Sequence, residues 1–266
     1  MCRLPGRNDA GVKVWTTVKI VACIPARYGS TRFAGKVVAK DTGKYLIQHT
    51  YERACLAHSI DRVIIATDDE RVIEAARSFA AECVLTSAEH QSGTDRIAEA
   101  VANVDAGIVV NLQADEPEID PANIDYLAHI LADNPDCPMA TLAAPFDNAG
   151  QIADPNIVKV VVGANGRAIY FSRSPIPYDR EKAGIGSVGQ YLRHIGIYAY
   201  RKKFLLQITR LPQTTLEKIE KLEQLRAIEN GFQILVGRVE HTCDGIDTPQ
   251  QYAEFVKRYT MESSRP

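Results

Sequence analysis

Three cationic side chains stand close together in the segment IPARYGSTRFAGK (residues 24–36), which directly follows the apolar run VKIVAC. Arg27, Arg32 and Lys36 are interleaved there with two glycines and with serine and threonine hydroxyls. Such side chains, together with the N–H groups of a glycine-bearing loop, bind phosphate oxygens. The segment is not a Walker A motif, because Gly29 comes one residue too early and Val37 follows the lysine. We predict a phosphate-binding loop of another kind, with a solvated surface loop as the alternative.

Two acidic segments are candidates for a metal site. Asp115 and Glu116 follow the apolar run GIVVNLQ (107–113), and Asp247 stands in CDGIDTPQQ (243–251) just before a predicted helix. Mg²⁺ in proteins usually takes one or two carboxylates and completes its coordination with phosphate oxygens and water. The alternative at each place is a structural turn before a helix. The spacing alone does not decide whether Asp115 and Asp247 meet.

Two other segments suit a ligand less specifically. In HQSGTDR (90–96), Ser92, Gly93 and Thr94 start a predicted helix, where they can bind an anion or a base, or can simply cap the helix. His194 lies in the apolar segment RHIGIYAY (193–200). A histidine in such a strand is as much a candidate for the core as for a ligand contact.

Charged side chains in the second half of the chain can be ligand contacts or solvated surface groups. Arg173 in YFSRSPIP and the carboxylates Glu217, Glu220 and Glu223 can face a polyhydroxylated acid, although a charged helix face is usually solvated. The segment GIGSVG (184–189) matches the glycine pattern of dinucleotide sites. It follows no apolar strand and begins no suitable helix, so we interpret it as a loop.

The elements that must position these side chains alternate in the first half of the chain. We predict strands at 18–24, 61–67, 82–86 and 107–113, and amphipathic helices at 45–57, 69–80 and 94–104. This order, with nearly continuous apolar strands, predicts a parallel sheet covered by helices on both faces. Ligands of such sheets bind at the carboxyl ends of the strands, which here means the loops after Cys23, Thr86 and Leu112.

The second half is less regular and predicts a partly antiparallel extension of the sheet. Expected strands are 139–146, 156–162, 168–173, 192–200 and 233–239. We also predict one helix over 215–231 that ends at Gly231, and a last helix over 247–259. In the last helix Thr248 is the expected N-cap, and Gln251 completes a capping box.

Composition excludes several classes of protein. The 266 residues carry a formal net charge of −2, which argues against a general nucleic-acid or membrane-surface binder. The six cysteines are scattered without metal-site spacing, as expected of free thiols in a reducing cytoplasm. No apolar run reaches the ~18 residues of a membrane span.

Residues 1–17 lack the apolar run of a secretory signal, and we expect a loose extension there, followed by a single domain over 18–260.

Taken in order, many segments closely resemble one enzyme family, the 3-deoxy-manno-octulosonate (Kdo) cytidylyltransferases or CMP-Kdo synthetases. The resemblance covers about residues 18 to 258, and the ordered set is far more specific than any one segment. The segments are IPARYGSTRFAGK, ATDDERV, SAEHQSGTDR, NLQADEPEI, DPNIVKVV, YFSRSPIP, RHIGIYAYR, LEKIEKLEQLRAIENG and GIDTP.

This resemblance implies an α/β fold of the nucleotide-diphospho-sugar transferase type, which is Rossmann-like. Its sheet is predominantly parallel with helices on both faces and carries a smaller antiparallel dimerisation extension. The implied reaction transfers CMP from CTP to the anomeric hydroxyl of Kdo, with Mg²⁺, and releases pyrophosphate for lipopolysaccharide biosynthesis. A cytoplasmic homodimer without nucleic-acid or membrane partners is expected.

The resemblance also assigns roles by position. Arg27, Lys36, Asp115 and Asp247 are the expected catalytic residues, and the two aspartates are the expected Mg²⁺ ligands. The residues expected to bind CTP are Ala26, Arg27, Arg32, Lys36, Ser92, Gly93 and Arg96. The residues expected to line the sugar pocket are Gln113, Arg173, His194, Tyr198, Glu220 and Gln224.

The chain departs from the family pattern near the expected site. Ala34 and Val37 replace prolines, and Ala114 replaces a glycine, so affinity and sugar choice can differ from those of the family.

One alternative function is cytidylyl transfer to a related acid sugar, such as 8-amino-Kdo or a sialic-type sugar. Another is a nucleotide-binding homologue without turnover, but the presence of both Asp115 and Asp247 counts against it. The RHIGIYAYR and LEQLR segments disfavour uridylyl or guanylyl transfer.

Overall fold

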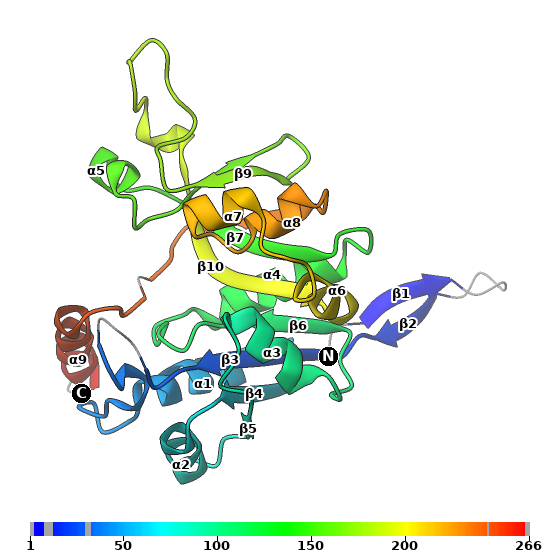
Figure 1. Ribbon diagram of the computed structural model, residues 1–266, viewed down its shortest axis with the longest axis vertical. Helices are drawn as coiled ribbons and strands as arrows, with labels where there is room; N and C mark the ends of the chain where they lie inside the picture. The colour runs from blue at the N-terminus through cyan, green and yellow to red at the C-terminus, as the bar shows by residue number, and fades with distance from the viewer. Residues whose placement is uncertain (1–2, 8–12, 30–32, 244, 264–266) are drawn as a thin grey trace.

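A nine-stranded mixed sheet forms the centre of the molecule in the computed structural model, which describes residues 3–7, 13–29, 33–243 and 245–263 (Figure 1). Seven strands follow one another in the order β11-β7-β10-β6-β3-β4-β5, and β8 and β9 extend the sheet from β10. Their bounds are β3 Ile20–Ala26, β4 Arg62–Thr67, β5 Cys83–Leu85, β6 Ile108–Asn111, β7 Met139–Pro145, β8 Lys159–Val162, β9 Ala168–Ser172, β10 Leu192–Arg201 and β11 Ile234–Arg238.

The strand directions divide the sheet into a parallel and a mixed part. Strands β6, β3, β4 and β5 are parallel neighbours, as the alternation of strands and helices in the first half predicts. Strand β10 runs antiparallel to both β6 and β7, and β11 is parallel to β7. Strands β8 and β9 form an antiparallel pair beside β10. The predicted fold class is therefore confirmed, including its partly antiparallel second half.

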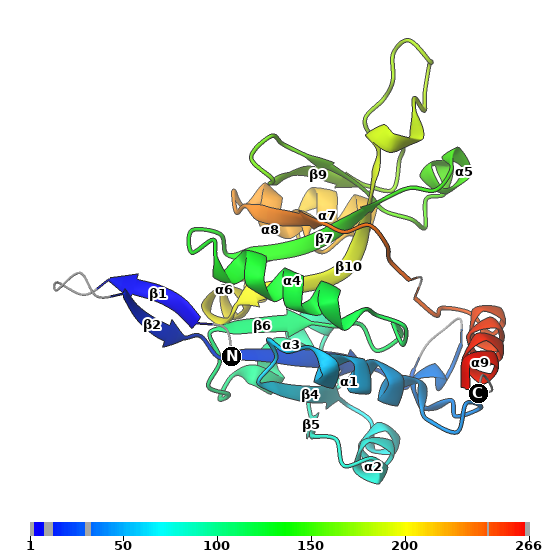
Figure 2. The same ribbon diagram turned by 180° about the vertical axis from the view of Figure 1, so that it is seen from behind.

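Helices cover both faces of the sheet. Their bounds are α1 Leu46–Leu56, α2 Glu70–Ser78, α3 Gly93–Val101, α4 Pro121–Ala132, α5 Ala149–Ala153, α6 Lys202–Ile208, α7 Thr215–Glu220, α8 Leu225–Glu229 and α9 Pro249–Ser263, with short 3-10 helices η1 Lys36–Val38 and η2 Val188–Gln190. Figure 1 shows α3 and α6 in front of the sheet, and Figure 2 shows α1 and α4 in front of its other face.

Strand β3 explains why both faces are covered. Ile20, Ala22 and Ile24 join the core beneath α1 and α4, whereas Val21 and Cys23 join the core beneath α3 and α6. Successive side chains of a strand point to opposite faces, so an apolar residue at every position needs a partner layer on each side. The continuous apolar run in the sequence thus places β3 inside the sheet, between β6 and β4.

The main departure from the predicted elements lies between 215 and 231. We predict one helix there, but the structure has α7 and α8, separated at Lys221, whose backbone is left-handed with φ 55°. The prediction of a continuous helix was wrong because the periodic apolar pattern carries no signal for this change. Gly231, with φ 80°, follows α8 as predicted.

The amino-terminal segment is also more ordered than the loose extension that the sequence predicts. Strands β1 (Arg3–Arg7) and β2 (Lys13–Thr17) pair antiparallel and form a separate two-stranded sheet. Figure 1 shows this pair projecting beside the main sheet. Within the described part of the chain, no helix is both long and apolar enough to cross a membrane.

At the opposite side of the molecule, helix α9 packs on α1 and on the loop after β3 (Figure 1). Leu46 of α1, Ile246, and Tyr252 and Phe255 of α9 form one buried apolar cluster, against which Phe33 is packed. The Tyr252 hydroxyl also accepts a hydrogen bond from the Asp41 amide at 2.9 Å. The end of the chain therefore supports the loop in which the sequence predicts phosphate binding.

Candidate active site

Lys36 brings together the two carboxylates that the sequence predicts as metal ligands. Its Nζ lies 2.5 Å from Asp115 Oδ2 and 3.1 Å from Asp247 Oδ1, and it donates to the carbonyl of Ile246 at 2.8 Å. Lys36 is buried, whereas 25% and 41% of the Asp115 and Asp247 side chains remain exposed. Residues 79 and 211 positions apart from Lys36 thus meet at one point.

Backbone contacts hold the two aspartates near each other. Asp115 follows β6, and its carbonyl accepts a hydrogen bond from the Ile246 amide at 2.8 Å. The predicted capping box of α9 is confirmed, because Gln251 N–H donates to Thr248 Oγ1 and Thr248 N–H donates to Gln251 Oε1. Gln251 Oε1 also accepts from the Asp247 amide at 2.8 Å, so the cap orients the residue that carries the carboxylate.

The loop before Lys36 depends on a glycine conformation. Gly35 is left-handed with φ 69°, and its N–H donates to the Tyr28 carbonyl at 3.0 Å. The Tyr28 ring lies against the position that a Gly35 side chain would occupy, with the nearest ring atom at 3.2 Å. The guanidinium of Arg71 covers the same ring at 3.3 Å from its centre. The turn that delivers Lys36 is therefore closed by packing as well as by hydrogen bonding.

A first cavity of about 440 Å³ opens at the carboxyl ends of β3 and β6. Seven of the predicted site residues are among those that line it, namely Arg27, Lys36, Ser92, Gly93, Gln113, Asp115 and Asp247. Val37 and Ala114, which depart from the family pattern, also line it. The size lies in the usual range for small-molecule sites, and the lining joins cations, a helix start and carboxylates.

A second cavity of about 590 Å³ adjoins the first and shares Asp115 and Asp247 with it. Its lining includes His194, one of the predicted sugar contacts. The other residues that line it are Glu116, Asp154, Asn156, Ile157, Val158, Arg193, Ile195, Gly196, Thr242, Cys243, Gly245, Thr248 and Gln251. Two neighbouring cavities that meet at a pair of carboxylates suit a reaction between two bound molecules.

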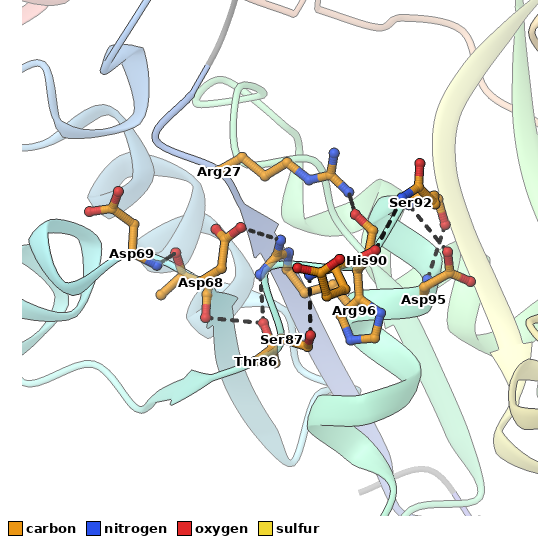
Figure 3. Close-up of polar contacts among 12 residues, drawn as sticks. Arg27, Asp68, Asp69, Thr86, Ser87, His90, Ser92, Asp95 and Arg96 are labelled. Carbon is orange, nitrogen blue, oxygen red and sulfur yellow. Dashed lines mark hydrogen bonds and ion pairs between the residues drawn. The ribbon is translucent and has the colours of Figure 1, made fainter.

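Figure 3 shows that two predicted nucleotide contacts, Arg27 and Arg96, lie in different surroundings. Arg27 is exposed, and its Nη2 donates to the carbonyl of His90 at 2.8 Å. Arg96 is fully buried, donates to Thr86 Oγ1 at 2.6 Å and forms an ion pair with Asp68 at 2.9 Å. Arg96 lines neither cavity. In this structure it connects Thr86, which follows β5, with Asp68, which follows β4.

The remaining nucleotide residues fit the prediction to different extents. Ser92 caps α3, accepting from the Asp95 amide at 3.1 Å, and lines the first cavity beside Gly93. Ala26 is fully buried between two residues that line the same cavity. Arg32 lies outside the described residues.

The predicted sugar residues separate into two groups. Gln113 and His194 line the first and second cavity, respectively, and the ring of Tyr198 lies 5.4 Å from that of His194. By contrast, Arg173 and Glu220 line neither cavity. Arg173 Nε donates to the Glu220 carbonyl at 2.7 Å, and the Glu220 carboxylate accepts from the Arg173 amide at 2.9 Å.

Gln224, the last predicted sugar residue, is buried at the start of α8. Its Nε2 has no hydrogen-bond partner within the described part of the chain.

Glu223 lies beside Gln224 and was not among the residues predicted for the sugar pocket. Its carboxylate accepts from Ser92 Oγ at 3.1 Å and from Thr94 Oγ1 at 2.9 Å. Burial raises the pKa of Glu223, opposed by the Thr94 hydrogen bond and by the charge of Arg226.

Two further residues of the second cavity, Glu116 and Arg193, were not selected from the sequence. Burial raises the pKa of Glu116 to about 8, the negative charge of Asp115 adds to the shift, and the Arg193 charge opposes it. The sequence did contain a signal for Glu116, since it follows Asp115 directly. Arg193 stands at the start of an apolar strand, where nothing in the pattern distinguishes it from a surface arginine.

His194 is neutral at physiological pH. Burial lowers its pKa to about 3. Its Nε2 lies 3.0 Å from Thr141 Oγ1, and its ring meets that of Phe171 edge to face at 5.0 Å. These contacts fix the ring at the edge of the second cavity, where a neutral imidazole can exchange hydrogen bonds but does not supply a positive charge.

A metal would depend on the two aspartates. Across the described ranges, no group of three or more histidine, cysteine, aspartate or glutamate side chains is arranged to hold a metal ion. Asp115 and Asp247 both contact one ammonium nitrogen, so their oxygens are separated by no more than two hydrogen-bond lengths. This donor pair fits a magnesium ion that takes its other ligands from phosphates and water.

A cationic loop and paired carboxylates at the carboxyl edge of the parallel part of the sheet are typical of a nucleotidyltransferase. A family model described as "Cytidylyltransferase" matches residues 21–234, and the chain belongs to this family. Within it, the chain groups with the 3-deoxy-manno-octulosonate cytidylyltransferases. One from Solibacter usitatus is 50% identical over 232 residues, 87% of this chain and 91% of that protein. Another, from Syntrophotalea carbinolica, is 48% identical over 239 residues, 88% of this chain and 95% of that protein.

Solved structures agree with this placement. A CMP:2-keto-3-deoxy-manno-octonic acid synthetase in complex with CTP matches with a TM-score of 0.86 and 43% identity, covering 92% of this chain and 99% of that one. A cytidylyltransferase from Leptospira borgpetersenii matches with a TM-score of 0.62 and 17% identity, covering 92% and 87%. The second match shows the fold alone.

Proposed function

We propose that the protein transfers CMP from CTP to the anomeric hydroxyl of Kdo and releases pyrophosphate, for lipopolysaccharide biosynthesis. One observation carries the proposal: two cavities of ligand size meet at Asp115 and Asp247, with the Lys36 ammonium between these carboxylates. The names of the relatives identify the nucleotide and the acceptor as CTP and Kdo.

The first cavity is the nucleotide site in this proposal. Arg27 and Lys36 supply positive charge for the triphosphate, and the start of α3 at Ser92 and Gly93 supplies N–H groups and a hydroxyl for the base. The acceptor hydroxyl attacks the α-phosphorus, and the bond to the pyrophosphate oxygen breaks. Such reactions depend mainly on positioning and on neutralising phosphate charge.

We further propose that the reaction needs Mg²⁺, held by Asp115 and Asp247. Their partial exposure toward both cavities and their hard oxygen atoms support this assignment. A bound Mg²⁺ would neutralise phosphate charge and lower the pKa of the attacking hydroxyl. For Lys36 we expect a shift of its ammonium toward the phosphates when the nucleotide binds, because the phosphate oxygens carry more charge than the Ile246 carbonyl that it now contacts.

The organisation of the protein belongs to the same proposal. We expect one catalytic domain over 18–260 that works as a homodimer in the cytoplasm. Large exposed apolar side chains on β9, α7 and the β9–β10 segment support self-association. The described cysteines, Cys23, Cys55, Cys83, Cys137 and Cys243, are free thiols, which supports a reducing compartment.

The proposed reaction is tested by pyrophosphate release from CTP and Mg²⁺ with Kdo, 8-amino-Kdo and N-acetylneuraminate as separate acceptors. We expect Kdo to give the highest kcat/KM. A higher kcat/KM with another acceptor would support cytidylyl transfer but would make that sugar, rather than Kdo, the acceptor. No release with any acceptor, in a preparation that binds CTP, would support the nucleotide-binding homologue without turnover.

Asp115→Asn tests the role of the paired carboxylates. We expect turnover to fall at least about 100-fold, because a ligand of the metal and of Lys36 is removed from the reacting centre. Asp105→Asn is the matched control, since Asp105 is an exposed aspartate in an ion pair with Lys19. Equal activity of both variants, with equal thermal stability, would contradict the assignment.

A further inference from the structure

The loop after β3 is closed by contacts between Tyr28 and Gly35. The Gly35 amide donates to the Tyr28 carbonyl at 3.0 Å, and the Tyr28 ring lies against the position that a Gly35 side chain would occupy. The residues that follow these two, Gly29 and Lys36, line the first cavity, whereas Tyr28 does not. The contact between Tyr28 and Gly35 therefore sets the separation of two residues that face a bound nucleotide.

A charged side chain from another element holds the Tyr28 ring. The Arg71 guanidinium lies over the ring at 3.3 Å from its centre. Asp69 fixes this guanidinium by accepting two hydrogen bonds, from Nε to Oδ1 at 2.8 Å and from Nη2 to Oδ2 at 2.6 Å. A guanidinium that is already oriented by a carboxylate loses little freedom when it packs on an aromatic face. Arg71 and Asp69 thus clamp one end of the loop to the start of α2.

Asp69 connects this clamp to the sheet. Its side chain caps α2 by accepting from the Arg71 amide at 3.0 Å. Its own amide donates to Oγ1 of Thr67 at 3.3 Å, and Thr67 is the fully buried last residue of β4. Strand β4 is the neighbour of β3 in the sheet. The Tyr28 ring is therefore positioned by a series of contacts that starts in a rigid element.

The turn that ends the loop is only partly restrained by its own residues. The Lys36 amide donates to the Phe33 carbonyl at 3.3 Å, and Gly35 at the third position has φ 69° and ψ 10°. Ala34 at the second position does not have a positive φ, so the turn is of type II. Proline is favoured at this second position because its ring fixes φ, whereas alanine leaves φ free. The contact with Arg71 supplies a restraint that the turn itself lacks.

Two simpler roles for Arg71 do not explain its position over the ring. A direct contact with the nucleotide is not supported, because Arg71 and Asp69 line neither cavity. A role in the stability of α2 alone is also insufficient. The Arg71 side chain is 59% exposed, and an exposed ion pair of this kind contributes little to stability.

We propose that Arg71 is a positioning residue for the nucleotide, which acts by holding the Tyr28 ring against the end of the loop. The inference rests on the proposed function, since it concerns the affinity of the first cavity for CTP. The clamp restricts the loop before CTP binds, so less conformational freedom is lost on binding. It does not touch the reacting atoms, so its removal raises the CTP concentration that the enzyme needs and leaves the rate at saturation unchanged.

Calorimetric titration of CTP in the presence of Mg²⁺ tests this role. For Arg71→Met, which removes the guanidinium, we expect the Kd to rise about 2- to 5-fold, as for one cation–π contact at an exposed site. The kcat at saturating CTP should stay unchanged. Asp69→Asn keeps a side chain that can cap α2 and should raise the Kd by a smaller factor. Arg77→Met, at an exposed position of the same helix, is the matched control and should leave the Kd unchanged.

Two further variants distinguish positioning of the loop from a general effect on stability. In the Tyr28→Leu background, Arg71→Met should have no further effect on the Kd, because the ring on which it acts is absent. Ala34→Pro should restore the CTP affinity of Arg71→Met and should improve the wild type less, because proline supplies the restraint within the turn. A loss of stability in α2 would not be repaired by a substitution in this loop.

The inference would be overturned if Arg71→Met bound CTP as tightly as Arg77→Met. An equal effect of Arg71→Met in the Tyr28→Leu background would have the same meaning, as would an Ala34→Pro gain that is equal in both proteins. A wild type that binds no CTP would contradict this inference and the proposed function together. The expected pattern of Kd values without pyrophosphate release from any acceptor would instead contradict the proposed reaction and leave the role of Arg71 standing.

Discussion

At the scale of single residues, the Lys36 ammonium joins three groups of the site. It meets Asp115, Asp247 and the Ile246 carbonyl, and the side chain is almost entirely buried. Three partners match the three donors of an ammonium group. A buried lysine satisfied in this way is held by residues of the site itself, which distinguishes it from the exposed lysines elsewhere on the surface.

Lys36→Met should lower kcat/KM for CTP by about 100-fold or more, because a preorganised charge beside the reacting phosphates is lost. Lys36→Arg should recover little, because a guanidinium does not fit between the two carboxylates. Steady-state pyrophosphate release measures the effect. Lys19→Met removes the lysine of an exposed ion pair and serves as the control. An unchanged kcat/KM in Lys36→Met would remove the role given to this residue.

His194 makes a contribution to stability that depends on pH. Its pKa is lowered from an unfolded value of 6.5 to about 3, so the unfolded chain takes up this proton first as pH falls. Stability linked to this residue is therefore complete above 6.5 and is lost between 6.5 and about 3. The loss is at most about 1.4 kcal/mol per pH unit.

Urea unfolding at pH 7 and pH 5 tests this linkage. We expect the wild type to lose more of its free energy of unfolding between these values than His194→Gln, which cannot be protonated there. Other titrating groups contribute equally to both proteins and cancel in the comparison. The same pH dependence in both would mean that the histidine is not the responsible group.

At the scale of elements, the short segment from Gly35 to Ala39 delivers Lys36 into the site. Gly35→Ala introduces a Cβ 3.2 Å from the Tyr28 ring at a φ of 69°. We expect a loss of about 1–2 kcal/mol in the free energy of unfolding and a lower kcat/KM for CTP, because the strain falls on the residue before Lys36.

Gly43→Ala separates these two effects. Gly43 has a similarly positive φ of 84°, but no atom beyond its two neighbours in the chain lies within 4 Å of its added Cβ. It should destabilise the protein by backbone strain alone and leave turnover at saturating CTP unchanged. Chemical unfolding and pyrophosphate release on the same preparations distinguish the two variants. Equal loss of turnover in both would show that the contact with Tyr28 is unimportant.

The elements also show what the sequence can predict. Strands β3, β4 and β6 were predictable because they are buried on both faces and therefore read as continuous apolar runs. The division between α7 and α8 was not, since nothing in the residue pattern marks the left-handed backbone of Lys221.

The same distinction applies to the site. Lys36 was predictable as a residue of the loop after a strand, Asp115 as a residue that follows a strand, and Asp247 as a residue that precedes a helix. Their meeting depends on the Ile246–Asp115 backbone bond, which no spacing reveals. Arg96 illustrates what the sequence leaves out. The family resemblance implied a nucleotide contact, whereas the ion pair with Asp68, which follows β4, is visible only in the fold.

At the scale of the whole molecule, three large exposed apolar side chains lie on elements of one end. Ile169 of β9, Tyr178 of the β9–β10 segment and Ile219 of α7 are 59%, 68% and 73% exposed. Figures 1 and 2 both show these elements at the end away from α2 and α9. Apolar surface of this kind favours self-association, which supports the proposed homodimer.

Light scattering after size exclusion should give twice the chain mass of 29.3 kDa for the wild type. We expect Ile219→Lys to shift the protein toward the monomer, because a charge at the contact must be desolvated. Leu56→Lys is the control, since Leu56 is 60% exposed on α1. A monomeric wild type, or an unaffected Ile219→Lys dimer, would contradict the proposed surface.

The contacts of Lys36 have a consequence for thermodynamic coupling between ligands. In the structure the ammonium already balances Asp115 and Asp247, so on the proposal above we expect these carboxylates to attract Mg²⁺ weakly on their own. A triphosphate that draws the ammonium away would leave them with uncompensated charge and raise their affinity for the cation. By linkage the cation would then raise the affinity for the nucleotide by the same factor. We therefore expect this one lysine to make the binding of nucleotide and cation cooperative.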